Sequence, residues 1–431
     1  MKRSIVWFKT DLRLQDNETL VKAIENSDEV LPVYVLEDNL FEETDFGTKK
    51  IGCFRYQFLV ESLIDLDTNL RKIGSGLLVV RGKAEVELPK LVKKYNISII
   101  FSKKEVAPEE RGLDQKVEKA VWKELCLFEQ CSTSTLYHAL DLPFPLKKIP
   151  DVFTSFRKKI EKETGVRGVF PMPKKINSPS IPSLVLPDPS IIGLEKSQMD
   201  ERSAVPFKGG ETEALRRIDY YLFEKKFIST YKKTRNGLIG KDYSSKLSIW
   251  LSIGCISPRM IYSQIKKYEE EVESNDSTYW LIFELIWRDY FRFMMKKYKN
   301  SYFLKEGIKD KEAINKYNLN PSVFEKWKLG CTGNSFIDAN MKELNLTGFM
   351  SNRGRQNVAS YFCNELSMDW RYGAAYFEEK LIDYDVCSNW GNWSYLAGVG
   401  NDPRGKRVFN IEKQVKDYDP SGHYQNLWLK K

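Results

Sequence analysis

The residues best suited to chemistry lie close together in the stretch LIDYDVCSNWGNW. Asp383, Asp385, Asn389, Trp390 and Trp393 bring two carboxylates, an amide and two indoles into this short run. Paired carboxylates are typical of hydrolases and of metal sites, but tryptophans fit neither kind of site. The alternative is a capped turn in which Asp383 pairs with an arginine and Trp393 packs in the core. The rest of the chain has to decide between these interpretations.

A second candidate is YSSKLS, at residues 243–248, which leads into an apolar run. Its hydroxyls and its lysine stand where a helix is predicted to begin. The free N–H groups and the positive dipole of a helix start can bind phosphate. The segment therefore indicates a phosphate site, with an ordinary serine N-cap as the alternative.

A third candidate is the helical stretch ELIWRDYFRF. Glu284 and Arg288 are spaced i,i+4 in the favourable order for an ion pair. Trp287 and Phe291 form an aromatic stripe beside them. A solvated ion pair above a core stripe is an equal alternative to a binding role.

The stretch TGFMSNRGRQNVA supplies a fourth candidate. On a helix, Asn352, Arg355, Gln356 and Ala359 share one face at i, i+3, i+4 and i+7. A core helix seldom carries two amides and a guanidinium on one face, so this face is predicted to bind a ligand. Arg353 points elsewhere and could reach a phosphate.

The elements that must position these groups fall into two halves that meet near residue 135. In the first half, short apolar runs alternate with amphipathic stretches, which predicts βαβ units and an open, doubly wound parallel sheet. The expected strands are 4–8, 30–36, 77–80, 97–101 and 125–128, and the expected helices are 17–25, 54–73, 86–95 and 109–122. No G-x-G-x-x-G follows the first strand, which argues against an ordinary dinucleotide site there.

The remainder is expected to be a linker followed by a helical domain. Residues 136–210 are rich in Pro, Ser and Lys, which predicts an extended segment with one helix near 154–162. From 211 to 431 the apolar residues recur with a helical period. The predicted fold class is therefore an α/β domain over 1–135, a long linker, and an all-α domain over 211–431.

Composition narrows the function classes. Seven cysteines without C-x-x-C spacing and only two histidines argue against a disulfide framework or a Cys/His metal site. No apolar run approaches a membrane span and the N-terminus does not read as a signal peptide, so we expect a cytoplasmic protein. A formal charge of +9 permits a polyanionic partner. The aromatic content of 13%, with ten tryptophans, suits stacking on bases or flavins and electron transfer.

Taken in order, these motifs resemble those of the photolyase/cryptochrome flavoproteins, and within them the DASH-type cryptochromes. The resemblance rests on YKKTRN, YSSKLSIWLSIGCISPR, FELIWRDYFRF, TGFMSNRGRQ, DWRYGA, LIDYDVCSN and GVGNDPR, in this order. The DASH type is indicated by STLYHALDLPFP and IPDVFTSFRKKIEKE in the linker. The resemblance covers essentially the whole chain.

The resemblance implies an FAD deep in the helical domain. Arg355 would pair with Asp383 beside the isoalloxazine, Asp385 would meet its polar edge, and Asn389 would be a neutral donor at N5. The acids would then tune a flavin rather than form a hydrolytic couple. The full set of implied cofactor residues is Tyr231, Arg235, Ser244, Ser245, Lys246, Leu247, Ser248, Glu284, Arg288, Asn352, Arg355, Asp383, Asp385 and Asn389.

The same resemblance implies a DNA partner carrying a cyclobutane pyrimidine dimer. In blue light, excited FADH⁻ would give an electron to the flipped-out dimer, the ring would split, and the electron would return. The implied lesion residues are Glu284, Trp287, Asn352, Arg353, Gln356, Tyr395 and Gln414. Gln356 and Tyr395 stand where duplex-acting photolyases carry Met and Trp, which favours single-stranded substrate, where flipping costs less. We expect a monomer without a metal, and the alternative function is a blue-light signalling or regulatory photoreceptor.

Electron supply and light harvesting are the parts in which this chain follows the family pattern least closely. Trp393 and Trp370 match the inner two members of the family's tryptophan chain, but the third position is Tyr317. A tyrosine must shed a proton on oxidation, so Trp390 is an alternative exit. A folate antenna, 5,10-methenyltetrahydrofolate, would contact Glu109 or Glu110, for which an acidic helix N-terminus is the alternative. Lys406 and Arg407 are candidate phosphate contacts.

Overall fold

A parallel sheet forms the N-terminal part of the computed structural model, which describes residues 1–309, 319–405 and 407–430. Its order is β3-β2-β1-β4-β5, so β1 pairs with both β2 and β4 and the chain winds outward in two directions. The predicted doubly wound sheet is confirmed. The strands are β1 (Arg3–Phe8), β2 (Glu29–Glu37), β3 (Leu78–Gly82), β4 (Ile99–Lys103) and β5 (Leu127–Cys131).

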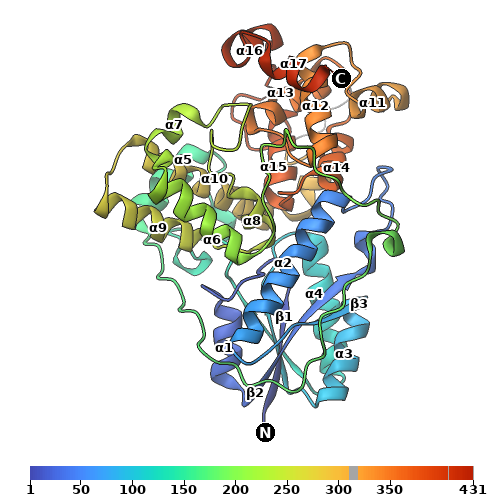
Figure 1. Cartoon of the computed structure of the whole chain (residues 1–431), viewed down its shortest axis with the longest axis vertical. Helices are drawn as coiled ribbons and strands as arrows, with labels where there is room; N and C mark the ends of the chain where they lie inside the picture. The colour runs from blue at the N-terminus through green and yellow to red at the C-terminus, as the bar shows by residue number, and fades with distance from the viewer. Residues whose placement is uncertain (310–318, 406, 431) are drawn as a thin grey trace.

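Both faces of the sheet are buried. Successive strand residues point to opposite faces, so neighbouring residues of one strand belong to different cores. On β1, Val6 and Phe8 face one core while Ile5 and Trp7 face another. The first core is covered by α1 and α2 and the second by α3 and α4 (Figure 1). These helices are α1 (Glu18–Asn26), α2 (Cys53–Lys72), α3 (Ala84–Tyr95) and α4 (Pro108–Trp122), close to the predicted ranges.

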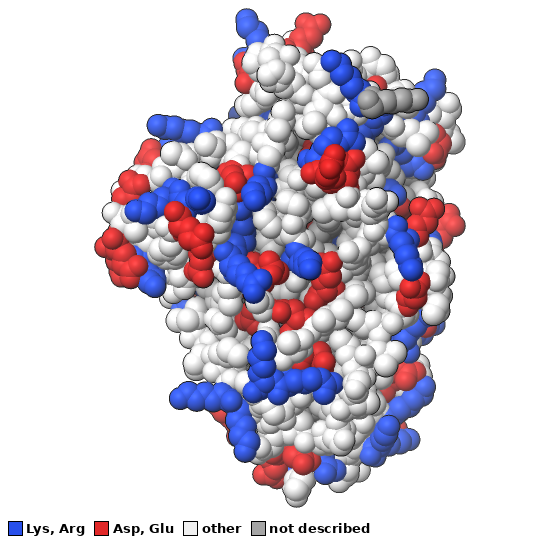
Figure 2. Space-filling view, viewed as in Figure 1, with Lys and Arg blue, Asp and Glu red and all other residues white. Residues whose placement is uncertain are grey.

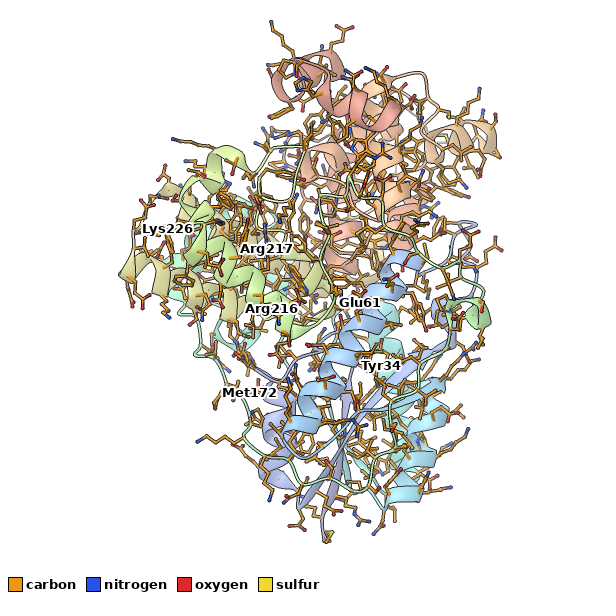
Figure 3. All side chains as sticks on the ribbon, in the orientation of Figure 1. Tyr34, Glu61, Met172, Arg216, Arg217 and Lys226 are labelled. Atoms are coloured by element: carbon orange, nitrogen blue, oxygen red, sulfur yellow. The ribbon has the colours of Figure 1, made fainter. Side chains whose placement is uncertain are left out.

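The segment between β5 and α6 is mostly extended and crosses the surface of the sheet part (Figure 1). Met172 marks it in Figure 3. Its one α-helix in the described residues, α5 (Phe153–Glu163), buries Phe153, Phe156 and Ile160 in the core of the helical part. That core continues into one face of the sheet, so the hydrophobic packing does not define a boundary between the sheet part and the helical part. The boundaries at residues 135 and 210 stay a prediction.

The C-terminal part is helical and is organised around α10 (Asp276–Tyr298), which is buried along most of its length. The helix starts at a capping box made by Asn275 and Thr278 and packs against α5, α7, α9 and α15. The other helices are α6 (Glu211–Asp219), α7 (Tyr231–Thr234), α8 (Ser248–Ile253), α9 (Pro258–Glu271), α11 (Pro321–Lys328), α12 (Ser335–Thr347), α13 (Asn352–Asn364), α14 (Trp370–Lys380), α15 (Val386–Leu396), α16 (Ile411–Tyr418) and α17 (His423–Leu429).

Buried carboxylates join the sheet part to the helical part. Asp16, after β1, receives Arg259 Nη2 at 2.6 Å and Nε at 3.0 Å, and also the hydroxyl of Ser257 at 2.5 Å. Glu211, at the start of α6, accepts the backbone N–H groups of Leu14 and Gln15 at 2.8 and 2.9 Å. The two parts are therefore held by directional polar contacts as well as by the shared core.

The surface carries both signs of charge. Figure 2 shows lysines and arginines interspersed with acids over the viewed face, without a field of one sign. Across the described residues, none of the helices is both long enough and apolar enough to cross a membrane.

We predict that Asp16→Asn destabilises the protein by roughly 3–5 kcal/mol, because it leaves Arg259 buried without a counter-charge. Asparagine also tolerates the left-handed backbone at this position, φ 49°, so the change removes the carboxylate without straining the backbone. The matched control is Glu87→Gln, whose partner Lys90 is largely exposed, with an expected loss of at most about 1 kcal/mol. Urea unfolding measures both, and equal losses would contradict the prediction.

Candidate functional site

A cavity of about 430 Å³ opens among the helices of the C-terminal part. Its volume lies in the range of roughly 300–1,000 Å³ that is usual for ligand pockets. Its walls come from α7, α10, α13, α15 and the loop before α8. The sequence-predicted residues that line it are Tyr231, Arg235, Ser244, Ser245, Lys246, Leu247, Ser248, Glu284, Trp287, Arg288, Asn352, Arg355, Gln356, Asp383, Asp385 and Tyr395.

A smaller cavity of about 80 Å³ adjoins the first and shares part of its wall. Asn389 and Trp393 line this second space, together with Arg355 and Asp383, which also line the large cavity. The amide and the inner indole of the opening motif therefore reach the same region as its carboxylates.

The loop before α8 carries the candidate phosphate residues. The N-cap of α8 is Leu247, which gives the helix no side-chain cap, and the hydroxyl of Ser248 donates instead to Asp383 at 2.7 Å. An ordinary serine N-cap is thus the wrong interpretation. Lys246 is 3% exposed, and its Nζ has no hydrogen-bond acceptor in the described structure, lying 3.1 Å from the centre of the Tyr243 ring. Burial lowers the pKa of Lys246 well below its ordinary value, and a diphosphate would supply the missing partner.

Arg217, which sequence reasoning missed, positions this loop from α6, where Figure 3 labels it. Its guanidinium donates to the backbone carbonyls of Ser245 at 3.0 Å, Lys241 at 2.9 Å and Ser244 at 3.2 Å. It also pairs with Asp242 at 2.9 Å. A signal was present, because helical periodicity puts this arginine on the buried face of α6.

Arg355 and Asp383 come together as the resemblance implied. Arg355 Nη2 lies 2.9 and 3.0 Å from the two carboxylate oxygens of Asp383, while its Nε donates to the carbonyl of Met350 at 2.8 Å. The pair is fixed between α13 and the segment before α15, so one wall of the cavity depends on it.

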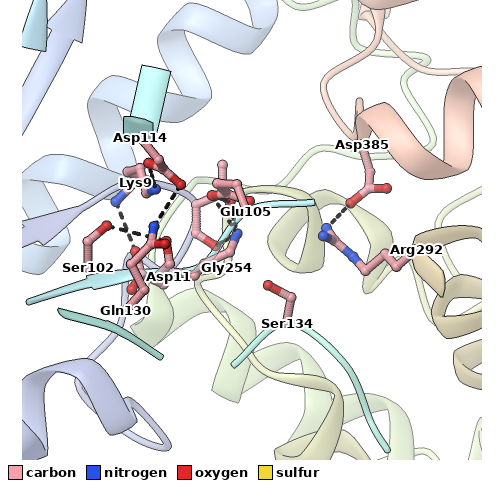
Figure 4. A network of polar contacts seen from close by, with 12 residues as sticks. Lys9, Asp11, Ser102, Glu105, Asp114, Gln130, Ser134, Gly254, Arg292 and Asp385 are labelled. Atoms are coloured by element: carbon pink, nitrogen blue, oxygen red, sulfur yellow. Dashed lines mark hydrogen bonds and ion pairs between the residues drawn. The ribbon is translucent and has the colours of Figure 1, made fainter. Parts of the chain in front are cut away.

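Asp385 is held as an ionised acceptor. It caps α15 by accepting the N–H of Ser388 at 2.9 Å and forms an ion pair with Arg292 (Figure 4), while Arg288 Nη2 lies 3.8 Å away. Burial alone would raise its pKa, but the charges of Arg292 and Arg288 and the Ser388 bond outweigh burial and hold the pKa below its ordinary value. Arg292 was missed, although its i,i+4 spacing from Arg288 on a buried helix pointed inward.

The expected ion pair between Glu284 and Arg288 is wrong. Glu284 pairs with Arg235, which directly follows the short helix α7. Arg288 Nη1 donates to the carbonyl of Ser134 at 2.6 Å, and its Nη2 to that of Leu251 at 3.3 Å. Each side chain finds a closer partner on another element. Burial raises the pKa of Glu284 against the opposing charge of Arg235.

Asn389 is oriented differently from the expectation of a donor. Its Nδ2 donates to the carbonyl of Ala374 at 2.9 Å. This bond leaves Oδ1, an acceptor, as the side-chain atom without an assigned role. An acceptor at this place suits an N–H on a reduced ring.

The indole of Trp287 is backed by the linker. The Phe153 ring stacks on it at 3.6 Å with an interplanar angle of 10°, and Tyr395 meets it edge-on at 6.1 Å. Arg407 Nη2 donates to the hydroxyl of Tyr395 at 2.7 Å and pairs with Asp402. A rigid, half-buried indole is thus presented to the cavity, and Phe153 had given no sequence signal of this role.

Several predicted residues are not brought into the cavity. Arg353 donates to Gln356 at 3.0 Å and to Asn236 at 3.1 Å, and Gln414 accepts from Asn357 at 3.3 Å. Trp370 is fully buried behind the cavities. Tyr317 and Lys406 lie outside the described residues.

A separate cavity of about 280 Å³ lies outside the carboxyl ends of β4 and β5. In open α/β sheets this is the usual place for a ligand. Its charged lining is mostly basic, with Lys104, Arg111, Lys296, Lys299, Arg292 and the acid Glu105.

The two candidate antenna acids differ in environment. Glu109 is exposed and pairs with Lys50. Glu110 is half-buried, and its Oε2 is shut off from solvent without a hydrogen-bond partner in the described structure. Burial and the neighbouring Glu105 raise the pKa of Glu110 to about 8. Of the two, Glu110 has the unused polar atom.

The chain matches two family models and several known proteins. A family model described as the FAD binding domain of DNA photolyase matches residues 280–431, and one described as DNA photolyase matches residues 4–175. "Cryptochrome DASH" of Gloeobacter violaceus is 45% identical over 99% of this chain and 85% of its own length, and that of Xenopus laevis is 46% identical over 99% and 82%. The crystal structure of a Synechocystis cryptochrome matches with a TM-score of 0.95 at 45% identity, covering 100% of this chain and 89% of that one. An archaeal photolyase from Sulfolobus tokodaii, solved with two FAD molecules, matches with a TM-score of 0.79 at 29% identity, covering 99% and 90%.

We predict that Asp383→Ala lowers the flavin content of the purified protein, because Arg355 loses its carboxylate and one wall of the cavity loosens. Breaking such a pair costs roughly 3–5 kcal/mol. The matched control is Asp369→Ala, which removes the partner of Arg371 (2.8 Å) away from the cavity and should leave the flavin content unchanged. Flavin absorbance relative to protein measures both. Full flavin in Asp383→Ala would contradict the assignment.

Proposed function

Because the chain belongs to the photolyase/cryptochrome family, and within it to the DASH-type cryptochromes, we propose that it is a blue-light-dependent FAD flavoprotein that repairs cyclobutane pyrimidine dimers, with a preference for single-stranded DNA. One observation carries the proposal. Residues expected around the cofactor and residues expected around the lesion line one continuous cavity. Cofactor and dimer would then lie within reach of each other.

The residues that line the cavity suit both the diphosphate and the ring end of FAD. Lys246, with no acceptor of its own, would meet the diphosphate on the loop that Arg217 braces. Arg355, Asp383 and Asp385 would hold the ring end, because they offer a guanidinium and carboxylate oxygens to its polar edge. When bound, FAD supplies the light absorption and the transferable electron, and the charges around it tune both.

The other part of the wall suits a flipped-out dimer. Trp287, held by Phe153, offers a flat apolar face, and Glu284 and Asn352 can hydrogen-bond to carbonyl and imide edges. Extracting the dimer from a duplex costs a few kcal/mol, and a single strand has already lost most of its stacking. The polar Gln356 and Tyr395 on this wall support a single-stranded substrate.

A signalling or regulatory photoreceptor is the second candidate, and one observation favours it. Arg353 and Gln414, both expected at the DNA, are engaged with protein partners instead. A photoreceptor of this kind would need the flavin and its electron supply but not the lesion contacts. The repair assay below separates the two functions.

The basic cavity beside the sheet suits an antenna. Folate carries carboxylates for the lysines and arginines of its lining. Glu110 does not itself line the cavity but precedes the lining residue Arg111, and its unpartnered Oε2 would suit a pterin amino group. A 5,10-methenyltetrahydrofolate antenna is therefore proposed there, with Glu110 rather than Glu109 as its carboxylate. The outer electron donor at Tyr317 stays a prediction from the resemblance.

We predict that the photoreduced protein restores dimer-containing oligonucleotides in blue light, faster on single strands than on duplexes. Loss of dimers, followed by chromatography of the products, measures the rate. Failure on both kinds of DNA would remove the lyase assignment and leave the photoreceptor.

The matched variants for this assay are Trp287→Ala and Trp122→Ala. The first removes stacking worth roughly 1–3 kcal/mol, so it should reduce the preference for damaged over undamaged strands. The second removes an indole that is 71% exposed, on α4, and should change nothing. If Trp287→Ala binds both kinds of strand as the parent does, the cavity does not read the lesion.

We predict that Trp393→Phe abolishes most flavin photoreduction but spares repair by the chemically reduced protein. The reason is that the indole lines the small cavity, where it would be the first electron donor, whereas the lesion wall is unchanged. Trp428→Phe, at a buried tryptophan outside all three cavities, is the control and should photoreduce normally. Bleaching of oxidised flavin under illumination with an external thiol reports the result. Normal photoreduction in Trp393→Phe would place the first donor elsewhere.

A further inference from the structure

An aromatic contact leads away from the flavin site beyond Trp370. The ring of Trp370, on α14, meets that of Trp390, on α15, edge-on at 5.7 Å. Trp390 in turn contacts Phe303 at 4.8 Å and the half-buried Phe46 at 6.2 Å. Trp390 is itself 5% exposed. If Trp370 is oxidised, a second indole, that of Trp390, is therefore in contact with it and is slightly more exposed.

The indole N–H of Trp390 has two side-chain acceptors, one of them a carboxylate. Its Nε1 donates to the hydroxyl of Tyr384 at 3.2 Å and to Glu378 Oε2 at 3.4 Å. An oxidised indole is a far stronger acid than a neutral one, and its acidic proton is this N–H. A carboxylate within hydrogen-bond reach can accept the proton. Once the proton has left, return of the electron is no longer a simple reversal.

Glu378 is placed to be that acceptor. The charged and titratable groups that face it are Arg55 and Lys50, from the segment around the start of α2, and Tyr384. The guanidinium of Arg55 lies 4.7 Å from the centre of the Tyr384 ring, which closes the cluster on that side. Burial raises the pKa of Glu378 against the charge of Arg55 and the Tyr384 hydrogen bond, which makes the carboxylate a better base.

The neighbouring indoles lack such an acceptor. Trp327 meets Trp393 edge-on at 6.2 Å, but its buried Nε1 has no hydrogen-bond partner in the described part of the chain. Trp370 Nε1 donates to the carbonyl of Lys305 at 3.1 Å, and a peptide carbonyl is a poor base. Among these indoles, Trp390 alone has a carboxylate at its N–H in the described residues.

We propose that Trp390 is the terminal electron donor of this chain and that Glu378 accepts its proton. The inference rests on the light-driven flavin function proposed above. Trp393 loses one electron to the photoexcited flavin, Trp370 restores Trp393, and Trp390 restores Trp370. The proton on Trp390 Nε1 passes to Glu378 Oε2, leaving a neutral indolyl radical. An external thiol then gives one electron to the indolyl radical and becomes a thiyl radical, releasing its own proton to solvent, and the proton held by Glu378 returns to the indole nitrogen.

The test is flash excitation of the full-length, FAD-loaded protein, followed by time-resolved absorption, electron paramagnetic resonance and infrared difference spectra. The parent should give a long-lived neutral indolyl radical together with the carbonyl stretch of a newly protonated carboxylic acid. In Glu378→Gln, which keeps the shape of the side chain, that stretch should vanish and deprotonation should slow by about 100-fold or more. In Trp390→Phe, the long-lived radical should be lost.

Two matched variants control for these changes. Glu379→Gln alters the adjacent carboxylate, which accepts the N–H of Lys49 and pairs with Lys380, and it should keep the parent's spectra. Trp327→Phe removes the indole on the other side of Trp393 and should keep the radical. Loss of the radical in Trp327→Phe, with retention in Trp390→Phe, would overturn the proposal.

The remaining outcomes also decide. An unchanged acid stretch and lifetime in Glu378→Gln would overturn the role of the carboxylate, and this variant decides even if Trp390→Phe fails to hold FAD. A parent that photoreduces normally but repairs no dimer would refute the repair function while leaving this route in place. A parent that shows no photoreduction at all would refute the light-driven function itself.

Discussion

Charged side chains on the buried helix α10 must each find a partner on another element, because an unpaired buried charge costs several kcal/mol. Four stand within one motif, and together they reach four other parts of the chain. Glu284 reaches Arg235, Arg288 the carbonyls of Ser134 and Leu251, Asp289 the N–H groups of Leu136 and Tyr137, and Arg292 the carboxylate of Asp385. The start of the linker, the short helix α7, α8 and α15 are all tied to α10 by this requirement.

The cavity follows from that arrangement. Elements whose charged groups converge on one helix cannot also close over it with apolar side chains, so a polar space is left between them. Its electrostatics are fixed in the process, since Arg292 keeps Asp385 ionised and Arg355 is matched to Asp383. The exception is Lys246, whose ammonium has no hydrogen-bond acceptor in the described residues and lies against the rings of Tyr243 and Phe349. The buried ammonium of Lys246 is therefore the group in this cavity that most needs a bound anion.

The secondary structure was predictable because it depends on local periodicity. The strands around Ile5 and Val33 and the helices around Leu63 and Val121 lie where the apolar pattern put them. The residues of a short motif that share one helix face could also be predicted, as Asn352, Arg355 and Gln356 show by lining the same cavity. The interaction partner of each side chain was not predictable from the sequence. The Glu284–Arg288 pair failed because spacing on one helix says nothing of Arg235 on another. The serine cap failed because the hydroxyl of Ser248 could not be known to face Asp383, and the backing of Trp287 by Phe153 joins residues that only the fold brings together.

That stacked pair of rings has a consequence for how the protein can be taken apart. Phe153 belongs to the segment between the sheet and the helical part, yet it holds the indole of Trp287 in place from behind. The unit that recognises a planar ligand is therefore larger than the helical part alone. A chimera that exchanged residues 211–431 between two relatives would separate the indole from its own backing. A domain exchange that keeps this stacked pair together therefore needs its boundary before α5 rather than after it.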